Sequence, residues 1–213
     1  MTVEVHILNA KNRLDPGVSD AIRSGIAAAV KMLSEHVRVD GIDIVVQLHE
    51  GSIWGRTYGP ESLTIYVNPE DPDLKRWTSE QFTHLAMHEL HHALRWKSLA
   101  IGSFDDWTPG EVLALEGLAT RCELFFGLPS YPALEIDDTL IDPLLEKIAS
   151  DISARYANAG WIDEQCGLPV DGVRAASAMG HLLVGRFLKR TGETPITALQ
   201  VPWAEIWDKG SVR

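Results

Sequence analysis

The fold is decided by residues 78–99, which read TSEQFTHLAMHELHHALRWKSL. Thr78 and Gln81 have the spacing of a capping box, which marks the start of a helix. Apolar residues then recur at intervals of three and four, and this pattern predicts one amphipathic helix over about 78–99. One arc of the helix is apolar, and the other carries four histidines. We therefore expect a helix that packs on the core with one side and lines a metal-binding cleft with the other.

Residues 88–92 of this helix read HELHH and match the pattern H-E-x-x-H. His88 and His92 are one turn apart, so both can direct a ring nitrogen at one zinc ion about 2.0–2.1 Å away. Glu89 lies one step round the helix, where it can accept a proton from a zinc-bound water, whose pKa the metal lowers towards about 7. His84 is about 12 Å from His92 along the helix axis, which argues against a three-histidine site. We interpret His84 and His91 as solvent-facing or supporting residues.

A catalytic zinc ion needs a third protein ligand and an open coordination position. The next predicted helix offers Glu111, Glu116 and Glu123. Glu111 completes a capping box with Thr108, and Glu123 lies near the helix end. Glu116 has apolar neighbours, among which a carboxylate is costly to bury unless it is paired or bound to metal, and Gly117 lets another backbone approach closely. We predict Glu116 as the third ligand, with a salt-bridge or surface role as the alternative.

The flanking sequence predicts an α+β fold in a single domain, residues 1–213. Alternating apolar residues predict strands near 3–7, 42–48 and 63–67, and Asp15-Pro16 begins a helix whose apolar face extends to Leu33. Further helices are predicted over about 109–126, 143–158 and 173–190. We expect an N-terminal lobe of about residues 1–76, with a small sheet and one helix. A mainly helical lobe of about residues 77–213 then carries the H-E-x-x-H helix.

The composition excludes several classes of protein. The chain has 213 residues, with 19 Lys+Arg and 30 Asp+Glu, and its formal net charge is −11. Nucleic-acid binding requires a basic surface, which this acidic balance argues against. No apolar run approaches the roughly 20 residues that span a bilayer, and the first residues lack a secretory signal pattern. Two cysteines fit a reducing compartment. We therefore expect a cytoplasmic protein with neither a nucleic-acid nor a membrane partner.

Two motifs, HELHHALR at residues 88–95 and EGLA at residues 116–119, resemble those of the gluzincin class of zinc metallopeptidases. More narrowly, they are similar to a bacterial family of predicted zinc-dependent proteases within a domain of unknown function. AMGHLLV, at residues 178–184, also looks like the penultimate helix of that family. The resemblance covers roughly residues 60–208. It implies a zincin-like fold, zinc held by His88, His92 and Glu116, Glu89 as general base, and a peptide or protein substrate.

Two positions depart from the pattern of these families. Many gluzincins have an aspartate four residues after the third ligand, where this chain has Thr120, a hydroxyl without charge. The related family commonly has a tyrosine at the position of His181. We expect His181 to donate a hydrogen bond to the oxyanion of the reaction, and Tyr156, Tyr58 and Arg56 are further candidates. The alternative for His181 is an interior histidine with a purely structural role.

Two segments before the zinc helix have possible roles in binding a substrate. The strand near 63–67 would form the sheet edge and accept an extended peptide through main-chain hydrogen bonds, or would simply pack on the first helix. Residues 51–60 are rich in glycine, and we interpret them as a loop, with a lid over the cleft as a hypothesis.

Zinc-dependent hydrolysis of peptide bonds is the leading hypothesis for the function. One alternative is a zinc-bearing peptide-binding or scaffold protein without turnover, and another is a hydrolase of non-peptide amides. The fourth coordination position separates an enzyme from a scaffold, because water there favours catalysis. A fourth protein ligand, such as His84 or Asp106, favours a structural site instead.

Overall fold

A computed structural model describes residues 3–100, 107–128, 139, 141–154 and 172–211 of the chain. The chain divides into two compact units, Met1–Lys97 and Ser98–Arg213. The first unit contains the sheet, and the second is helical. The predicted boundary near residue 77 put the H-E-x-x-H helix in the helical lobe. In the structure, this helix belongs almost entirely to the first unit, together with the sheet.

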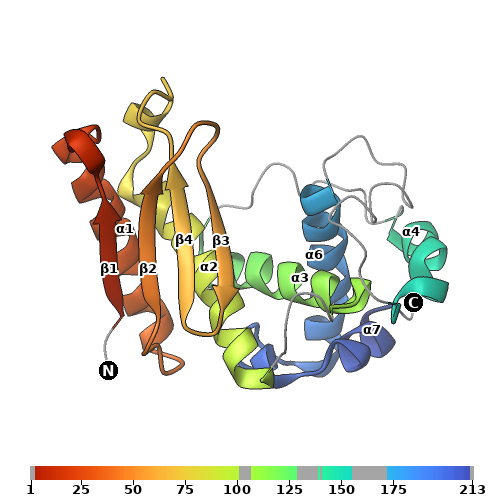
Figure 1. The fold of residues 1–213 in the computed structure, drawn as a ribbon. Helices are drawn as coiled ribbons and strands as arrows, with labels where there is room; N and C mark the ends of the chain where they lie inside the picture. Colours follow the sequence, from red (N-terminus) through yellow and green to blue (C-terminus); the bar gives the residue numbers. More distant parts are fainter. Residues whose placement is uncertain (1–2, 101–106, 129–138, 140, 155–171, 212–213) are drawn as a thin grey trace. The chain divides into compact units, whose positions relative to one another are not determined.

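The first unit is built on a four-stranded mixed sheet in the order β1-β2-β4-β3 (Figure 1). Its strands are β1 (Glu4–Leu8), β2 (Asp43–Leu48), β3 (Trp54–Gly59) and β4 (Ser62–Val67). The first three strands in this order run parallel, and β3 pairs antiparallel with β4 at one edge of the sheet.

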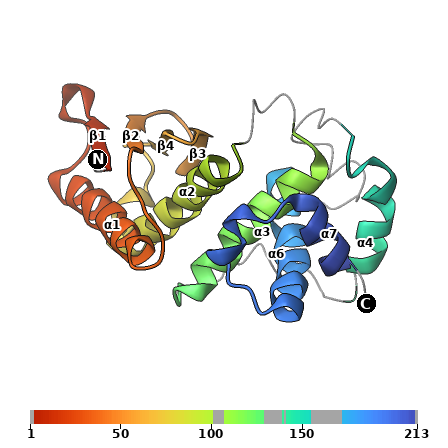
Figure 2. The same cartoon turned by 90° about the horizontal axis from the view of Figure 1, so that it is seen from below.

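Two helices cover one face of this sheet, α1 (Pro16–Ser34) and α2 (Ser79–Leu99) (Figures 1 and 2). Asp15 caps α1 by accepting a hydrogen bond from the backbone N–H of Gly17. Apolar side chains of both helices, among them Ile26 and Phe82, are buried together with side chains of the strands. At Gly25 the helices approach closely, because a Cβ there would lie 2.5 Å from the carbonyl oxygen of Ser79. Short 3₁₀ turns, Ala10–Asn12 and Leu74–Arg76, precede α1 and α2.

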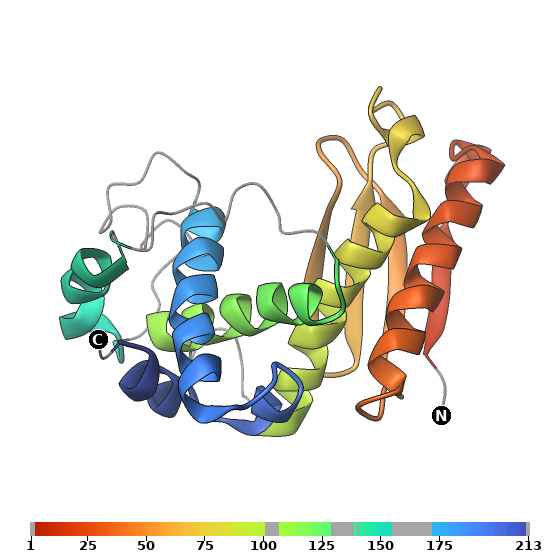
Figure 3. The same cartoon turned by 180° about the vertical axis from the view of Figure 1, so that it is seen from behind.

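In its described residues, the second unit packs four helices around a core: α3 (Pro109–Phe125), α4 (Ile141–Ile148), α6 (Gly172–Thr191) and α7 (Trp203–Ser211). Figure 3 shows α6 crossing α3, with α7 alongside. Short 3₁₀ turns occupy Ala149–Asp151 and Thr197–Gln200. The core combines buried aliphatic residues with Phe187. No helix in the described ranges is both long enough and apolar enough to cross a membrane.

The α+β class and most of the elements predicted from the sequence are confirmed. Two predictions about the sheet were wrong. Residues 54–59 form strand β3 rather than part of a lid loop, and β3, not β4, is the edge strand. The helix predicted over 143–158 instead begins at Ile141 and ends at Ile148, where the chain tightens into a 3₁₀ turn. Residues 155–158 lie outside the described ranges, and α7 was not predicted.

Candidate metal centre

The α2 helix brings two of the predicted ligands together. The rings of His88 and His92 have centroids 4.4 Å apart and planes at 80° to each other, as expected for residues one helical turn apart. His92 is buried and His88 is half-buried. The apolar arc holds the helix in place, since Phe82 and Leu90 are fully buried. The pair is thus presented by a helix that is fixed on its opposite side.

The other two histidines of α2 differ in their environment. His91 is fully buried, which contradicts the solvent-facing alternative and leaves the supporting one. Its position on the helix, about 100° round from His92, turns it toward the apolar arc. His84 is half-buried.

Glu89, the predicted general base, is buried with 6% of its surface exposed. The hydroxyl of Thr57 on β3 lies 2.8 Å from its Oε2 atom and 2.8 Å from its backbone carbonyl oxygen. A buried carboxylate is stable only with such partners. The edge strand therefore provides the immediate surroundings of this side chain.

Glu116, the predicted third ligand, lies in the middle of α3 and is half-buried. Ser177 on α6 donates a hydrogen bond of 2.6 Å to its Oε2 atom. Glu111 closes the predicted capping box with Thr108, so its carboxylate is engaged at the helix start. Glu123 is buried near the helix end.

Two groups of side chains in the described part of the chain have the composition of a metal site. The first consists of His88, His92 and Glu116, and one ligand atom from each lies within 4.8 Å of the others. Two imidazoles and one carboxylate form a donor set typical of divalent metals such as zinc. The second group, Glu4, His6 and Asp43, lies on the exposed surface of β1 and β2, where such groups are common without a metal.

His181, the predicted oxyanion donor, is almost fully buried on α6, and its Nδ1 atom lies 3.1 Å from the hydroxyl of Thr120. The two positions at which the sequence departs from the resembled families thus contact each other. Arg121 donates a hydrogen bond of 2.8 Å to the backbone carbonyl of His181. Burial, together with the positive charge of Arg121, lowers the pKa of His181 to about 4 against the opposing effect of Glu123. The ring is therefore neutral at pH 7.

The two remaining oxyanion candidates that the structure describes are not beside Glu89. Tyr58 and Arg56 project from the opposite face of β3, where the guanidinium carbon lies 5.2 Å from the centre of the Tyr58 ring. The Tyr58 hydroxyl lies 2.5 Å from that of Tyr66. Tyr156 and Asp106 lie outside the described residues.

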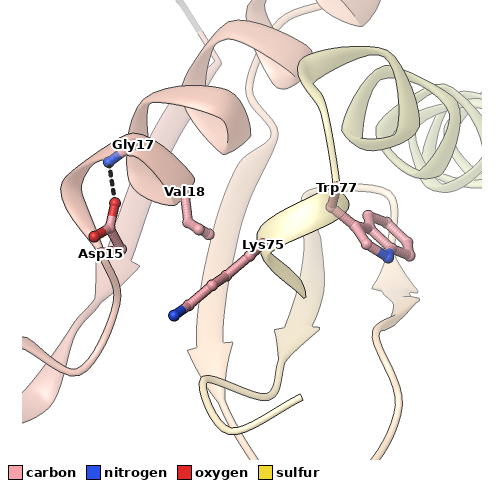
Figure 4. Close-up of a pocket in the computed structure, with 5 residues that line it drawn as sticks. All are labelled: Asp15, Gly17, Val18, Lys75 and Trp77. Carbon is pink, nitrogen blue, oxygen red and sulfur yellow. Dashed lines mark hydrogen bonds between the residues drawn. The ribbon is translucent and has the colours of Figure 1, made fainter. Parts of the chain in front are cut away.

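A separate cavity in the first unit has a volume of about 310 Å³ (Figure 4). It is lined by Asp15, Gly17, Val18, Lys75 and Trp77. Asp15 is already engaged as the cap of α1, accepting the 2.8 Å hydrogen bond from Gly17 drawn in Figure 4. The lining includes none of the predicted ligand or catalytic residues, so the cavity is not part of the candidate metal centre.

Two residues of β3 that were not predicted, Gly55 and Thr57, lie against Glu89. The signal that could have identified them is an alternation of large and small residues over 54–59, which read WGRTYG. No protein-family model matches this chain, and no curated protein matches it. The likeness to zinc-dependent proteases therefore remains a prediction from the motifs.

Proposed function

We propose that this protein is a zinc-dependent metallopeptidase with a zincin-like fold, in which His88, His92 and Glu116 bind the metal. The observation that carries the proposal is the group formed by these three residues, with the buried Glu89 next to His88 in the sequence. These three residues could hold one metal ion, and two imidazoles with one carboxylate are a donor set that suits zinc.

The chemistry divides between the metal and the chain. Zinc, when bound, would polarise the scissile carbonyl and lower the pKa of a bound water. The Glu89 carboxylate accepts a proton from the attacking water and then delivers it to the leaving nitrogen. The protons balance, because the one that leaves the water ends on the new amine. His181, neutral at pH 7, is proposed to donate a hydrogen bond to the oxyanion.

The test compares zinc binding and peptide hydrolysis in the same preparations. Wild-type protein, stripped of metal and titrated with zinc, should bind one equivalent and cleave members of a peptide library, with products identified by mass spectrometry. Glu89→Gln should bind zinc as tightly as the wild type but cleave nothing. Glu80→Gln is the matched control, because Glu80 is an exposed residue of the same helix.

Three outcomes contradict parts of the proposal. Zinc binding without any cleavage by the wild type would favour a peptide-binding or scaffold protein. Equal cleavage by Glu89→Gln would reject the general-base role. Unchanged zinc affinity in Glu116→Ala would remove that residue from the metal centre.

A further inference from the structure

We propose that the edge strand β3 positions the Glu89 carboxylate through two residues, with Thr57 as its hydrogen-bond donor and Gly55 as the space it occupies. This inference rests on the proposed function and deepens it, because it assigns positioning residues to the same reaction. All three residues belong to the first unit, so the contacts are internal to one compact body.

Thr57 reaches two oxygen atoms of the same residue. Its hydroxyl is 2.8 Å from the Oε2 atom of Glu89 and 2.8 Å from the Glu89 carbonyl oxygen, and Thr57 itself is buried. One hydroxyl proton serves one acceptor at a time, and an ionised carboxylate is the stronger acceptor. Once Glu89 carries the proton, the carboxyl group can donate to the Thr57 oxygen, which then donates to the carbonyl. The contact therefore persists on both sides of the proton transfer.

Gly55 contacts the other side of the same carboxylate. A Cβ at this position would lie 2.5 Å from Cγ of Glu89 and 2.9 Å from its Oε1 atom. The backbone of Gly55 is not in the left-handed region, so alanine can adopt its conformation. The backbone conformation therefore does not require glycine at position 55. The absence of a side chain there leaves space that Glu89 occupies. Gly55 and Thr57 together limit the rotamers available to the carboxylate.

The opposite face of β3 keeps these two residues in place. Because side chains alternate along a strand, Trp54 and Tyr58 lie on the side away from Glu89. The Trp54 ring stacks on Tyr66 of β4 with centroids 4.3 Å apart, and the hydroxyls of Tyr58 and Tyr66 lie 2.5 Å apart. The register of the β3–β4 pairing shifts between Thr57 and Gly59, as at a β-bulge or a similar irregularity. Bulges re-aim side chains at the edges of sheets.

The experiment uses two pairs of variants in the zinc-loaded full chain. Thr57→Val removes the hydroxyl at nearly constant shape, and Thr57→Ser restores it. Gly55→Ala introduces a methyl group against Glu89, and Gly59→Ala introduces one in the same strand where no atom lies within 4 Å. For each variant we would measure kcat, KM, the zinc dissociation constant and Tm.

Thr57→Val should lower kcat by about 10- to 100-fold, with KM and zinc affinity within about twofold of the wild type. Thr57→Ser should recover most of the lost kcat, because serine keeps the hydroxyl. If the methyl group of Thr57 mattered instead, serine, which lacks it, would not restore kcat. Gly55→Ala should lower kcat to a similar extent with little change in Tm, because the flexible Glu89 side chain can move aside. Gly59→Ala should match the wild type.

A readout without turnover separates this inference from the proposed function. In metal-free protein, Thr57→Val should lower Tm more in the wild-type background than in a Glu89→Ala background, because in the latter the contact with the carboxylate is already lost and only the one with the backbone carbonyl oxygen remains. Equal shifts in both backgrounds, or wild-type kcat in Thr57→Val, would overturn the inference alone. An inactive wild type would overturn the proposed function together with the positioning roles.

Discussion

Gly117 on α3 and Gly180 on α6 are so close that a Cβ on Gly117 would lie 2.1 Å from the carbonyl oxygen of Gly180. Gly180 likewise faces the backbone of α3, since a Cβ on Gly180 would lie 2.3 Å from the carbonyl oxygen of Leu113. The two helices, which Figure 3 shows crossing, are therefore in close backbone contact at these glycines. Glu116 and Ser177 lie within one helical turn of these glycines. The close approach of the helices therefore brings the Ser177 hydroxyl within hydrogen-bond distance of the Glu116 carboxylate.

Gly117→Ala should therefore destabilise the second unit, although alanine favours an isolated helix by about 1 kcal/mol. The obstructing atom belongs to the backbone and cannot rotate away, so the helices must separate at a net cost of about 2 kcal/mol or more. Urea unfolding followed by circular dichroism would measure this cost. Gly59→Ala, which meets open space, should change stability little. A Gly117→Ala protein as stable as the wild type would contradict the backbone contact.

Ser177→Ala should weaken zinc binding without abolishing it. The Ser177 hydroxyl donates to the Oε2 atom of Glu116 at 2.6 Å and so orients that carboxylate. Loss of such a supporting hydrogen bond typically costs about 10- to 100-fold in metal affinity. Competition with a chromophoric chelator would measure the dissociation constant. Ser34→Ala is the control, because its hydroxyl donates to a carbonyl of its own helix, α1. Equal weakening in both variants would contradict the specific role of Ser177.

His181 should make the stability of metal-free protein depend on pH. Its pKa is about 4 in the folded chain, against an ordinary value of 6.5. Between these values the unfolded chain binds a proton that the folded chain does not, so the free energy of unfolding falls as pH drops from 6.5 to 4. His181→Asn keeps a polar group near Thr120 but removes the titration. The midpoint of urea unfolding should therefore decrease less between pH 7.5 and pH 4.5 in the variant than in the wild type. Parallel losses would contradict the lowered pKa.

The features that sequence reasoning predicted correctly depend on contacts between residues close along the chain. The capping box at Thr108 depends on groups three residues apart and is present. At Thr78, the Gln81 side chain accepts a hydrogen bond from the backbone N–H, which is one half of the predicted box. The spacing of His88 and His92 depends on one helical turn. Gly117 was also expected to permit a close backbone approach, because it lacks a side chain of its own. The approach is present, but its partner, Gly180, is far along the chain and was not predicted.

The features that were missed depend on partners that the local sequence does not contain. Glycines at 51, 55 and 59 suggested a loop, yet residues 54–59 are held as a strand by cross-strand contacts of Trp54 and Tyr58 with Tyr66. Tertiary pairing therefore overrode the low strand propensity of glycine. Because this strand was interpreted as a loop, Gly55 and Thr57 could not be connected with Glu89. The solvent-facing alternative for His91 was wrong, because helical periodicity alone does not say how wide the buried arc is.

Cys122 should react with thiol reagents only when the second unit opens. Its side chain is fully buried on α3, and burial, with a further contribution from the charge of Glu123, raises the pKa of the thiol above its ordinary value. In a Cys166→Ser background, which leaves one thiol, labelling of the native protein at pH 8 should be at least about a hundredfold slower than labelling of the unfolded chain. Labelling at the unfolded rate would contradict the burial of Cys122.

The same labelling rate provides a test of zinc binding by Glu116 that needs no substrate. A ligand that binds only the folded state stabilises it by about 2.7 kcal/mol at a hundred times its dissociation constant, which corresponds to an opening about a hundredfold rarer. Zinc should therefore slow the labelling of Cys122, which lies less than two turns along α3 from Glu116. In Glu116→Ala the metal should lose most of this protective effect, whereas in Glu89→Gln it should protect as in the wild type, because Glu89 is not a ligand. Equal protection by zinc in Glu116→Ala and in the wild type would mean that the metal stabilises the second unit through some other group, and Glu116 would no longer be supported as a ligand.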